Sequence, residues 1–288
     1  MGKSTAWAAA NNVSAVMRNV NTGLANERAG TAVLIADVNA DRVPDTIVGM
    51  PGNGAMTGSI VVTYGRFKGW KNVLFHRLYG TYGYRVYGET AGSGFGSSLG
   101  YADVNGDYLG DIIVGAPNAS GNAGATYLVF GSVASKKAWF WRATTVNGVI
   151  GARITGVSGG DHSGTAVAGA DINGDGIGDV VIGAPNAAPG ALVDAGTTYV
   201  MFGKKTWAST ISLSTLDGTT GFMLNGSTTG DVSGTALAVG DINSDYTADI
   251  IIGAPRADYS AVNGGAVYTF YGQRRPAPWM LNRDLNSL

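Results

Sequence analysis

The 288-residue chain contains no cysteine, carries little charge and has no long apolar run. Without cysteine it forms no disulfides, has no thiol nucleophile and holds no zinc through thiolates. Only 14% of its residues are charged, the formal net charge is −1, and lysine and arginine form no block. This balance excludes the basic surface that nucleic acid or an anionic membrane attracts. Since no apolar stretch approaches the roughly 20 residues that span a bilayer, we expect no direct membrane insertion.

The residues that are abundant favour short strands. Hydrophobic residues make up 45% of the chain, which is enough for a large core, and there are 46 glycines. Glycine together with many Thr, Val and Ala is typical of strands joined by tight turns. The composition therefore predicts a soluble all-β protein without long helices.

A nine-residue acidic motif, D-x-N-x-D-x-x-x-D, occurs four times, and each copy runs into apolar residues and a Gly-x-Pro. Its polar residues are spaced by two, two and four, which does not follow the 3.6-residue period of a helix. Twelve of the 20 acidic residues lie in these copies, so something must offset their repulsion. The copies begin at Asp37, Asp103, Asp171 and Asp241, at intervals of 66, 68 and 70 residues. Such a period indicates a repeat architecture, in which each unit buries its apolar face against its neighbours.

Strand patterns recur around each acidic motif. A small-residue strand precedes the motif, an apolar strand follows it, and an alternating strand ending in aromatic-Gly comes next, as in "ATYLVFG" from Ala125. A fourth strand follows at Tyr84, Ala152 and Phe222. Four short strands separated by turns predict one antiparallel blade per repeat.

With the acidic loop, the Gly-Ala-Pro and Phe95-Gly96, the sequence resembles the FG-GAP repeats of the integrin α-subunit β-propeller. The resemblance covers roughly residues 14–272. It implies a calcium ion in the loop between the first two strands of each blade and an adhesion or surface-binding role. Integrin propellers have seven blades and most of those blades lack the loop, whereas this chain has four repeats that all carry it.

The expected fold is a single domain over residues 1–288, a β-propeller of four FG-GAP-type blades. "SAVMRNVNTG" from Ser14 aligns with "GFMLNGSTTG" from Gly221, so we expect residues 14–23 to add the missing fourth strand of the last blade and close the ring. An open arc, a larger ring and two chains pairing into one ring also fit the count. The repeats span approximately residues 24–88, 89–157, 158–226 and 227–288.

The loops offer only hard oxygen donors, a set that selects Ca²⁺ over transition metals, and five or more flexible ligands suit Ca²⁺ better than Mg²⁺. Arg42 and Pro44 make the first loop the last expected to fill, and Asx-turns without metal are the alternative reading. Up to four calcium ions are expected, one per repeat. The ligands are the side chains at positions 1, 3, 5 and 9 and the carbonyl at position 7: Asp37, Asn39, Asp41, Val43 and Asp45; Asp103, Asn105, Asp107, Leu109 and Asp111; Asp171, Asn173, Asp175, Ile177 and Asp179; Asp241, Asn243, Asp245, Thr247 and Asp249.

The sequence offers no catalytic site. The two histidines, His76 and His162, have no nucleophile at motif spacing. We therefore expect a non-catalytic, extracellular or cell-surface module that binds a protein or glycan. A structural subunit of a surface layer, appendage or larger complex, binding copies of itself, is the alternative, and an accessory domain of a hydrolase is a third.

A binding face, if present, is expected in the loops that vary most among the copies. These are the connections between blades and the loops after each Gly-Ala-Pro. Their polar and aromatic side chains are Asp161, His162, Asp194, Arg256, Asp258 and Tyr259.

Overall fold

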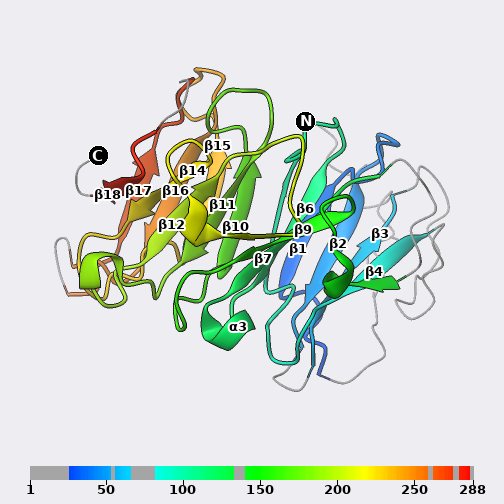
Figure 1. Cartoon of the computed structure of the whole chain (residues 1–288), viewed down its shortest axis with the longest axis horizontal. Helices are drawn as coiled ribbons and strands as arrows, with labels where there is room; N and C mark the ends of the chain where they lie inside the picture. Colours follow the sequence, from blue (N-terminus) through cyan, green and yellow to red (C-terminus); the bar gives the residue numbers. More distant parts are fainter. Residues whose placement is uncertain are drawn as a thin grey trace, which may run out of the picture.

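Strands arranged in four sheets make up the described part of the chain (Figure 1). The computed structural model describes residues 26–52, 56–65, 82–132, 140–258, 262–274 and 279–285. Within these ranges the helical segments are a four-residue α3 (Ala119–Asn122) and three short 3-10 turns. In the same ranges, no helix has the length and apolarity needed to cross a membrane. The all-β prediction is confirmed.

Each sheet is one repeat, with its strands antiparallel in chain order. The first three strands come from the three patterns around the acidic motif, and the fourth follows at the predicted place in repeats one to three. The strands are β1 (Ala32–Ala36), β2 (Asp45–Met50), β3 (Ser59–Thr63) and β4 (Gly83–Tyr87); β5 (Ser98–Ala102), β6 (Asp111–Ala116), β7 (Ala125–Val129) and β9 (Gly151–Thr155); β10 (Ala166–Ala170), β11 (Asp179–Ala184), β12 (Thr197–Met201) and β14 (Gly221–Asn225); β15 (Ala236–Gly240), β16 (Asp249–Ala254) and β17 (Ala266–Phe270).

A fifth strand, which the sequence patterns did not predict, joins each of the first three sheets. It comes from the following repeat, between that repeat's third strand and the place of its fourth. β8 (Phe140–Arg142) pairs in parallel with β4, β13 (Thr210–Ser212) with β9, and β18 (Asn282–Asp284) with β14. Each repeat therefore clasps the outer strand of the repeat before it.

Aromatic side chains anchor these clasps. Trp207, just before β13, is buried and donates its indole Nε1–H to the carbonyl of Val104 at 3.0 Å. Trp279 occupies the same position before β18 and stacks on Phe222, with ring centroids 4.9 Å apart and planes 7° from parallel. Stacked and tilted aromatic pairs add to the free energy of area burial. The clasps are thus part of the core that lies between successive sheets.

The sheets pack face to face in chain order, and Figure 1 shows the first (blue) and the last (orange to red) at opposite ends of the row. One cluster joins β2, β3 and β4 to β6 and β7, with Phe95 against Tyr127 at 5.2 Å between ring centroids. A second cluster lies between the second and third sheets and a third between the third and fourth. This succession is propeller-like, and it explains why the inner strands β3, β6, β7, β11 and β12 are buried on both faces.

A repeated glycine in the second strand sets how closely neighbouring sheets approach. A Cβ placed on Gly183 would lie 2.0 Å from the carbonyl oxygen of Gly234, the glycine that opens β15 with φ +85°. Gly115 faces Gly164 in the same way, at 2.1 Å. A heavy atom cannot fit at these distances, so the Gly of Gly-Ala-Pro is required by packing between repeats.

The ends of the row differ from its middle. Val33 and Ile35 on β1 are 70% and 74% exposed, and Val267 on β17 is 72% exposed. The strand that we expect to add to β17, residues 14–23, lies outside the described residues. The blade count, the ring closure and the repeat boundaries therefore stay predictions.

Replacing Gly183 with alanine is expected to lower the free energy of unfolding by about 1–3 kcal/mol or more, because the new methyl meets backbone rather than a flexible side chain. Gly240→Ala is the control: within the described residues no atom lies within 4 Å of a Cβ built there, and the third sheet already has Ala170 at the same position. Urea unfolding of both variants tests this. Equal losses at the two positions would contradict the packing role.

Candidate metal centre

The four acidic loops connect the first and second strands of their sheets, so each lies at the end of the sheet opposite the Gly-Ala-Pro turn. Each loop turns twice through the left-handed region. In the second loop these residues are Gly106 (φ 68°) and Tyr108 (φ 66°), and in the fourth Ser244 (φ 63°) and Tyr246 (φ 66°). Non-glycine residues adopt this conformation only when other contacts enforce it. The loop's own carboxylates supply those contacts.

The first aspartate of each loop holds the turn from inside. Asp103 accepts the backbone N–H of Asp107 on Oδ1 at 3.1 Å and that of Tyr108 on Oδ2 at 2.8 Å. Asp241 does the same for Asp245 and Tyr246, at 3.1 and 2.9 Å. Both oxygens therefore point into the loop, toward its amide groups.

The residues at positions 3 and 5 continue this network. Asn105 accepts the N–H of Asp107 at 2.9 Å and donates its side-chain amide to Asp107 Oδ2 at 3.1 Å. Asp107 in turn accepts the N–H of Leu109 on Oδ1 at 2.8 Å. The same three bonds recur at the other loops. The predicted ligands at positions 1, 3 and 5 thus line one small turn.

The last aspartate of each loop has a different role, because it is completely buried. Asp111 accepts two backbone N–H groups, from Val104 in its own loop at 2.8 Å and from Gly131 after the third strand at 2.7 Å. It therefore ties the acidic loop to the end of β7. The equivalent carboxylates make the same pair of bonds: Asp45 with Val38 and Gly65, Asp179 with Ile172 and Gly203, Asp249 with Ile242 and Gly272.

Burial also makes three of these carboxylates, Asp45, Asp111 and Asp179, costly to charge. It raises the pKa of Asp45 to about 6, of Asp111 to about 7 and of Asp179 to about 8, although the two backbone N–H bonds oppose the shift. The other two aspartates of the same loop, at positions 1 and 5, add to the rise by repulsion. This carboxylate therefore either has a cation close by and stays charged, or takes up a proton and becomes neutral.

The side chains at positions 1, 3 and 5 share one turn in every loop, as predicted, and position 9 anchors that turn. Even so, in the ranges that the structure describes, no three acidic or histidine side chains stand in an arrangement that could hold a metal ion. The ligand set and the carbonyl ligands Val43, Leu109, Ile177 and Thr247 stay predictions.

Comparison with known proteins identifies the family of the repeats. The FG-GAP repeat family matches residues 163–201 and 233–270, which contain the third and fourth acidic loops. The chain carries FG-GAP repeats. The structure gives the first two repeats the same strands and the same loop bonds, so all four copies are one kind of unit.

Relatives that share the FG-GAP repeats are large proteins. The chain is 27% identical over 203 residues to phosphatidylinositol-glycan-specific phospholipase D of Dictyostelium discoideum, which is 66% of this chain and 21% of that protein. The enzyme of the same name from Bos taurus is 29% identical over 181 residues, 61% of this chain and 20% of its own length. Integrin alpha-PS2 of Drosophila melanogaster is 30% identical over 191 residues, which make up 60% of this chain and 11% of the integrin. The chain spans about a fifth or less of the length of these relatives.

The variable loops lie at the opposite end of the sheets from the FG-GAP acidic loops. Asp161 and Asp194 line one cavity there, whereas His162 holds its ring against the Gly160 carbonyl at 2.8 Å. Tyr259 and His76 lie outside the described residues. The cavity also contains Tyr199 and Asn225, which sequence reasoning missed because both belong to strands.

Asp111→Ala is expected to destabilise the metal-free protein by about 2–4 kcal/mol, because it leaves two buried backbone N–H groups without an acceptor. Asp107→Ala removes bonds in an exposed turn and should cost about 1 kcal/mol or less. Denaturant unfolding in a chelating buffer measures both. A loss for Asp107→Ala as large as that for Asp111→Ala would contradict the separate roles.

Proposed function

We propose that this chain is a non-catalytic, calcium-binding FG-GAP β-propeller that acts as an extracellular or cell-surface module and binds a protein or glycan. One observation carries the proposal: four loops of the same sequence form the same carboxylate-lined turn, each braced by a buried aspartate. A single active site does not need four copies, whereas a repeated structural ion does.

The residues present fit calcium by their chemistry. In the second loop Asp103, Asn105 and Asp107 each use side-chain oxygens for backbone N–H bonds, and a carboxylate has about four acceptor positions, so capacity remains for a metal. Three carboxylates and an amide are hard oxygen donors of the kind that Ca²⁺ prefers. Bound calcium would supply positive charge to this turn, and the side chains at positions 1, 3, 5 and 9 of each loop would hold it.

The exposed apolar side chains on the two end sheets support a closed ring of four blades. Val33 and Ile35 on β1 and Val267 on β17 are exposed, while their equivalents Leu99, Tyr101 and Thr198 lie against a neighbouring sheet. We propose that residues 14–23 add to β17 as the fourth strand of the last blade, which would bring the two end sheets together.

Two other functions have observations in their favour. The exposed apolar side chains on the end sheets also suit self-assembly, as in a subunit of a surface layer or appendage. The relatives named phospholipase D suit an accessory domain beside a catalytic domain. Light scattering distinguishes the first alternative: a calcium-bound monomer at all concentrations favours the binding module, and reversible growth with concentration favours assembly.

Calcium is expected to stabilise the protein by about 2.7 kcal/mol for each site when its concentration is a hundred times the dissociation constant. Asp107→Asn should reduce this calcium-dependent gain by about one site's share and change the stability in chelator little, because the asparagine keeps an acceptor for Leu109. Asp217→Asn, at an exposed aspartate outside the loops, is the control and should keep the full gain. Thermal unfolding with and without calcium measures all three proteins.

Surface binding is tested by adding the labelled, calcium-loaded protein to intact cells and to deglycosylated and protease-treated cells. Calcium-dependent binding that one of these treatments removes supports the module and tells protein from glycan. Strong calcium-dependent stabilisation without binding to any surface would contradict the adhesion role, although the proposal that the chain binds calcium would still hold.

A further inference from the structure

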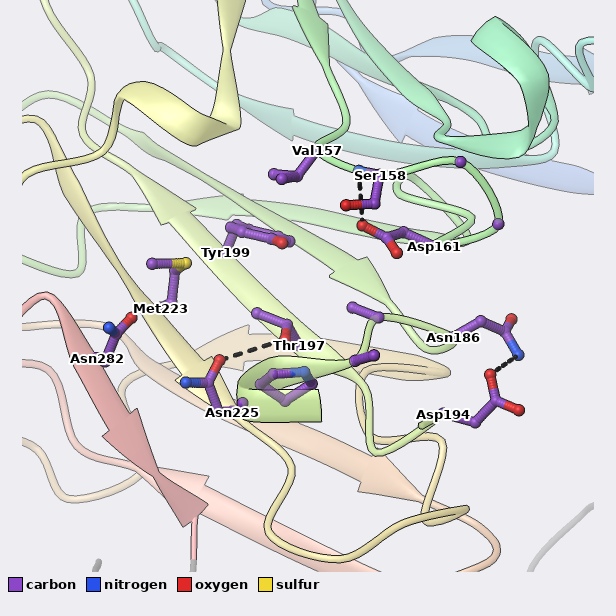
Figure 2. Close-up of a pocket in the computed structure, with 16 residues that line it drawn as sticks. Val157, Ser158, Asp161, Asn186, Asp194, Thr197, Tyr199, Met223, Asn225 and Asn282 are labelled. Carbon is purple, nitrogen blue, oxygen red and sulfur yellow. Dashed lines mark hydrogen bonds between the residues drawn. The ribbon is translucent and has the colours of Figure 1, made fainter. Parts of the chain in front are cut away.

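A cavity of about 550 Å³ opens at the rim of the third sheet, at the end opposite the acidic loops. Its walls are the connection from β9 to β10, the loop between β11 and β12, and the ends of β12, β14 and β18 (Figure 2). The volume lies in the range of roughly 300–1,000 Å³ that is typical of small-ligand sites. The acidic loops do not contribute to it.

Comparison with the second sheet explains why this cavity exists. There, Tyr127 donates its hydroxyl to Glu89 at 2.6 Å, and Arg153 pairs with Glu89 at 3.3 Å while lying over the Tyr127 ring. The ion pair closes the space above the tyrosine. In the third sheet the tyrosine is kept as Tyr199, paired with Met223 as Tyr127 is paired with Arg153.

The two charged residues have been replaced together. Met223 stands on β14 where the second sheet has Arg153 on β9. Val157 stands where the second sheet has Glu89, because each of the two directly follows the Gly that ends a fourth strand. Neither side chain offers Tyr199 the carboxylate acceptor that Glu89 offers Tyr127. The loop after Gly-Ala-Pro is also four residues longer here than in the second repeat, between Pro185 and Tyr199. These three differences turn a closed contact into a cavity.

Polar side chains face the cavity in fixed positions (Figure 2). Asp161 accepts the N–H of Ser158 on Oδ2 at 2.9 Å, Asp194 accepts the Asn186 amide on Oδ1 at 3.1 Å, and Asn225 accepts the Thr197 hydroxyl at 3.2 Å. Within the described residues, these bonds leave one oxygen of each carboxylate, the Asn225 amide group and the Tyr199 hydroxyl for a ligand.

The walls are held together before any ligand binds. Asn186 donates its backbone N–H to the carbonyl of Asp161 at 3.3 Å, which joins two walls directly. Val232 and Gly230, in the next connection, donate to the carbonyls of Asp194 and Val193 at 2.9 and 3.0 Å. A site that is ordered in advance loses less conformational entropy when a ligand binds.

The lining chemistry selects the ligand class. Asp161 and Asp194 supply negative charge, and among the described residues no basic side chain lines the cavity, which disfavours phosphate, sulfate and other anionic groups. Amide, phenol and carboxylate groups alternate with Val157 and Met223, so hydrogen-bond donors, acceptors and apolar surface are all present. A saccharide ring matches this mixture, because its hydroxyls donate to carboxylates and accept from amides while its C–H face packs on apolar atoms.

We propose that this cavity binds a neutral saccharide unit of a glycan, with Asp161, Asp194, Asn225 and Tyr199 as the hydrogen-bonding residues. The proposal deepens the proposed function and rests on it for the glycan partner. It distinguishes the third repeat from the second, which closes the same position with Arg153 and Glu89.

The test uses the calcium-loaded full chain with methyl-labelled methionine, so that Met223 reports on the cavity by NMR. The probes are neutral di- and trisaccharides of glucose, galactose, mannose and N-acetylglucosamine, a sialylated trisaccharide, a heparin fragment and tetramethylammonium. We expect at least one neutral sugar to shift the Met223 methyl saturably and the anionic sugars to leave it unchanged. No shift with any neutral sugar, or shifts with the anionic sugars or the ammonium probe alone, would overturn the proposal.

Two variants assign the binding to the site. Val157→Glu with Met223→Arg rebuilds the pair of the second repeat and should abolish sugar binding, read by calorimetry because the reporter is lost. Asn225→Ala should weaken it at least tenfold, and Thr155→Ala, the equivalent change on β9, should leave it unchanged. Unaltered sugar affinity in the rebuilt variant would overturn the site.

The same rebuilt variant separates the two proposals. If it keeps calcium-dependent stability and cell-surface binding while the parent chain shows no sugar binding, the cavity proposal fails and the proposed function stands. If sugar binding is present and the rebuilt variant loses both sugar and cell-surface binding, the cavity is the binding site of the module.

Discussion

A buried carboxylate at the end of each acidic loop organises every repeat. Asp45, Asp111, Asp179 and Asp249 have no exposed surface, and each accepts one backbone N–H from its own loop and one from the residue after the third strand. Three strands are thereby fixed at one end of the sheet by a single side chain. For Asp45, Asp111 and Asp179 the arrangement is costly, because desolvation and the neighbouring aspartates oppose the negative charge and raise the carboxyl pKa. A cation in the turn is the physical means of offsetting that cost without protonating the carboxylate.

The buried carboxylate joins strands within one sheet, and packing between repeats joins neighbouring sheets. The glycines of the second strands permit backbone contact between neighbouring sheets, and the clasp strands β8, β13 and β18 extend each sheet with residues of the next repeat. Each repeat therefore depends on its neighbours for part of its core, as in other repeat proteins. Such a frame tolerates changes at the rim, and the third repeat uses that tolerance to open a polar cavity beside Tyr199.

Features with a clear sequence pattern were predictable, and features without one were not. The period, the acidic loops and the four strand patterns appear in register, so the strands β1–β7 and their sheet order follow from pattern alone. The clasps escaped prediction because strands of three residues, such as Thr210–Ser212, carry too little periodicity and pair in parallel with another repeat. The burial of Asp111 was also hidden, since a charged residue in a polar loop gives no sign that it points inward.

The cavity shows a further limit. Val157 and Met223 are ordinary apolar residues in isolation, and their meaning appears only when the third repeat is aligned with the second, where Glu89 and Arg153 form an ion pair. Comparison between repeats of the same chain could have found this signal. It requires knowing that the two positions meet in space, which the register of β7 with β9 and of β12 with β14 supplies.

A calcium titration of the metal-stripped chain by calorimetry shows most directly whether the acidic loops bind calcium. We expect four sites per chain, or three sites followed by a weaker one in the loop that contains Arg42 and Pro44. A heat signal no different from that of buffer would contradict this expectation and would leave the acidic loops as turns held by hydrogen bonds alone.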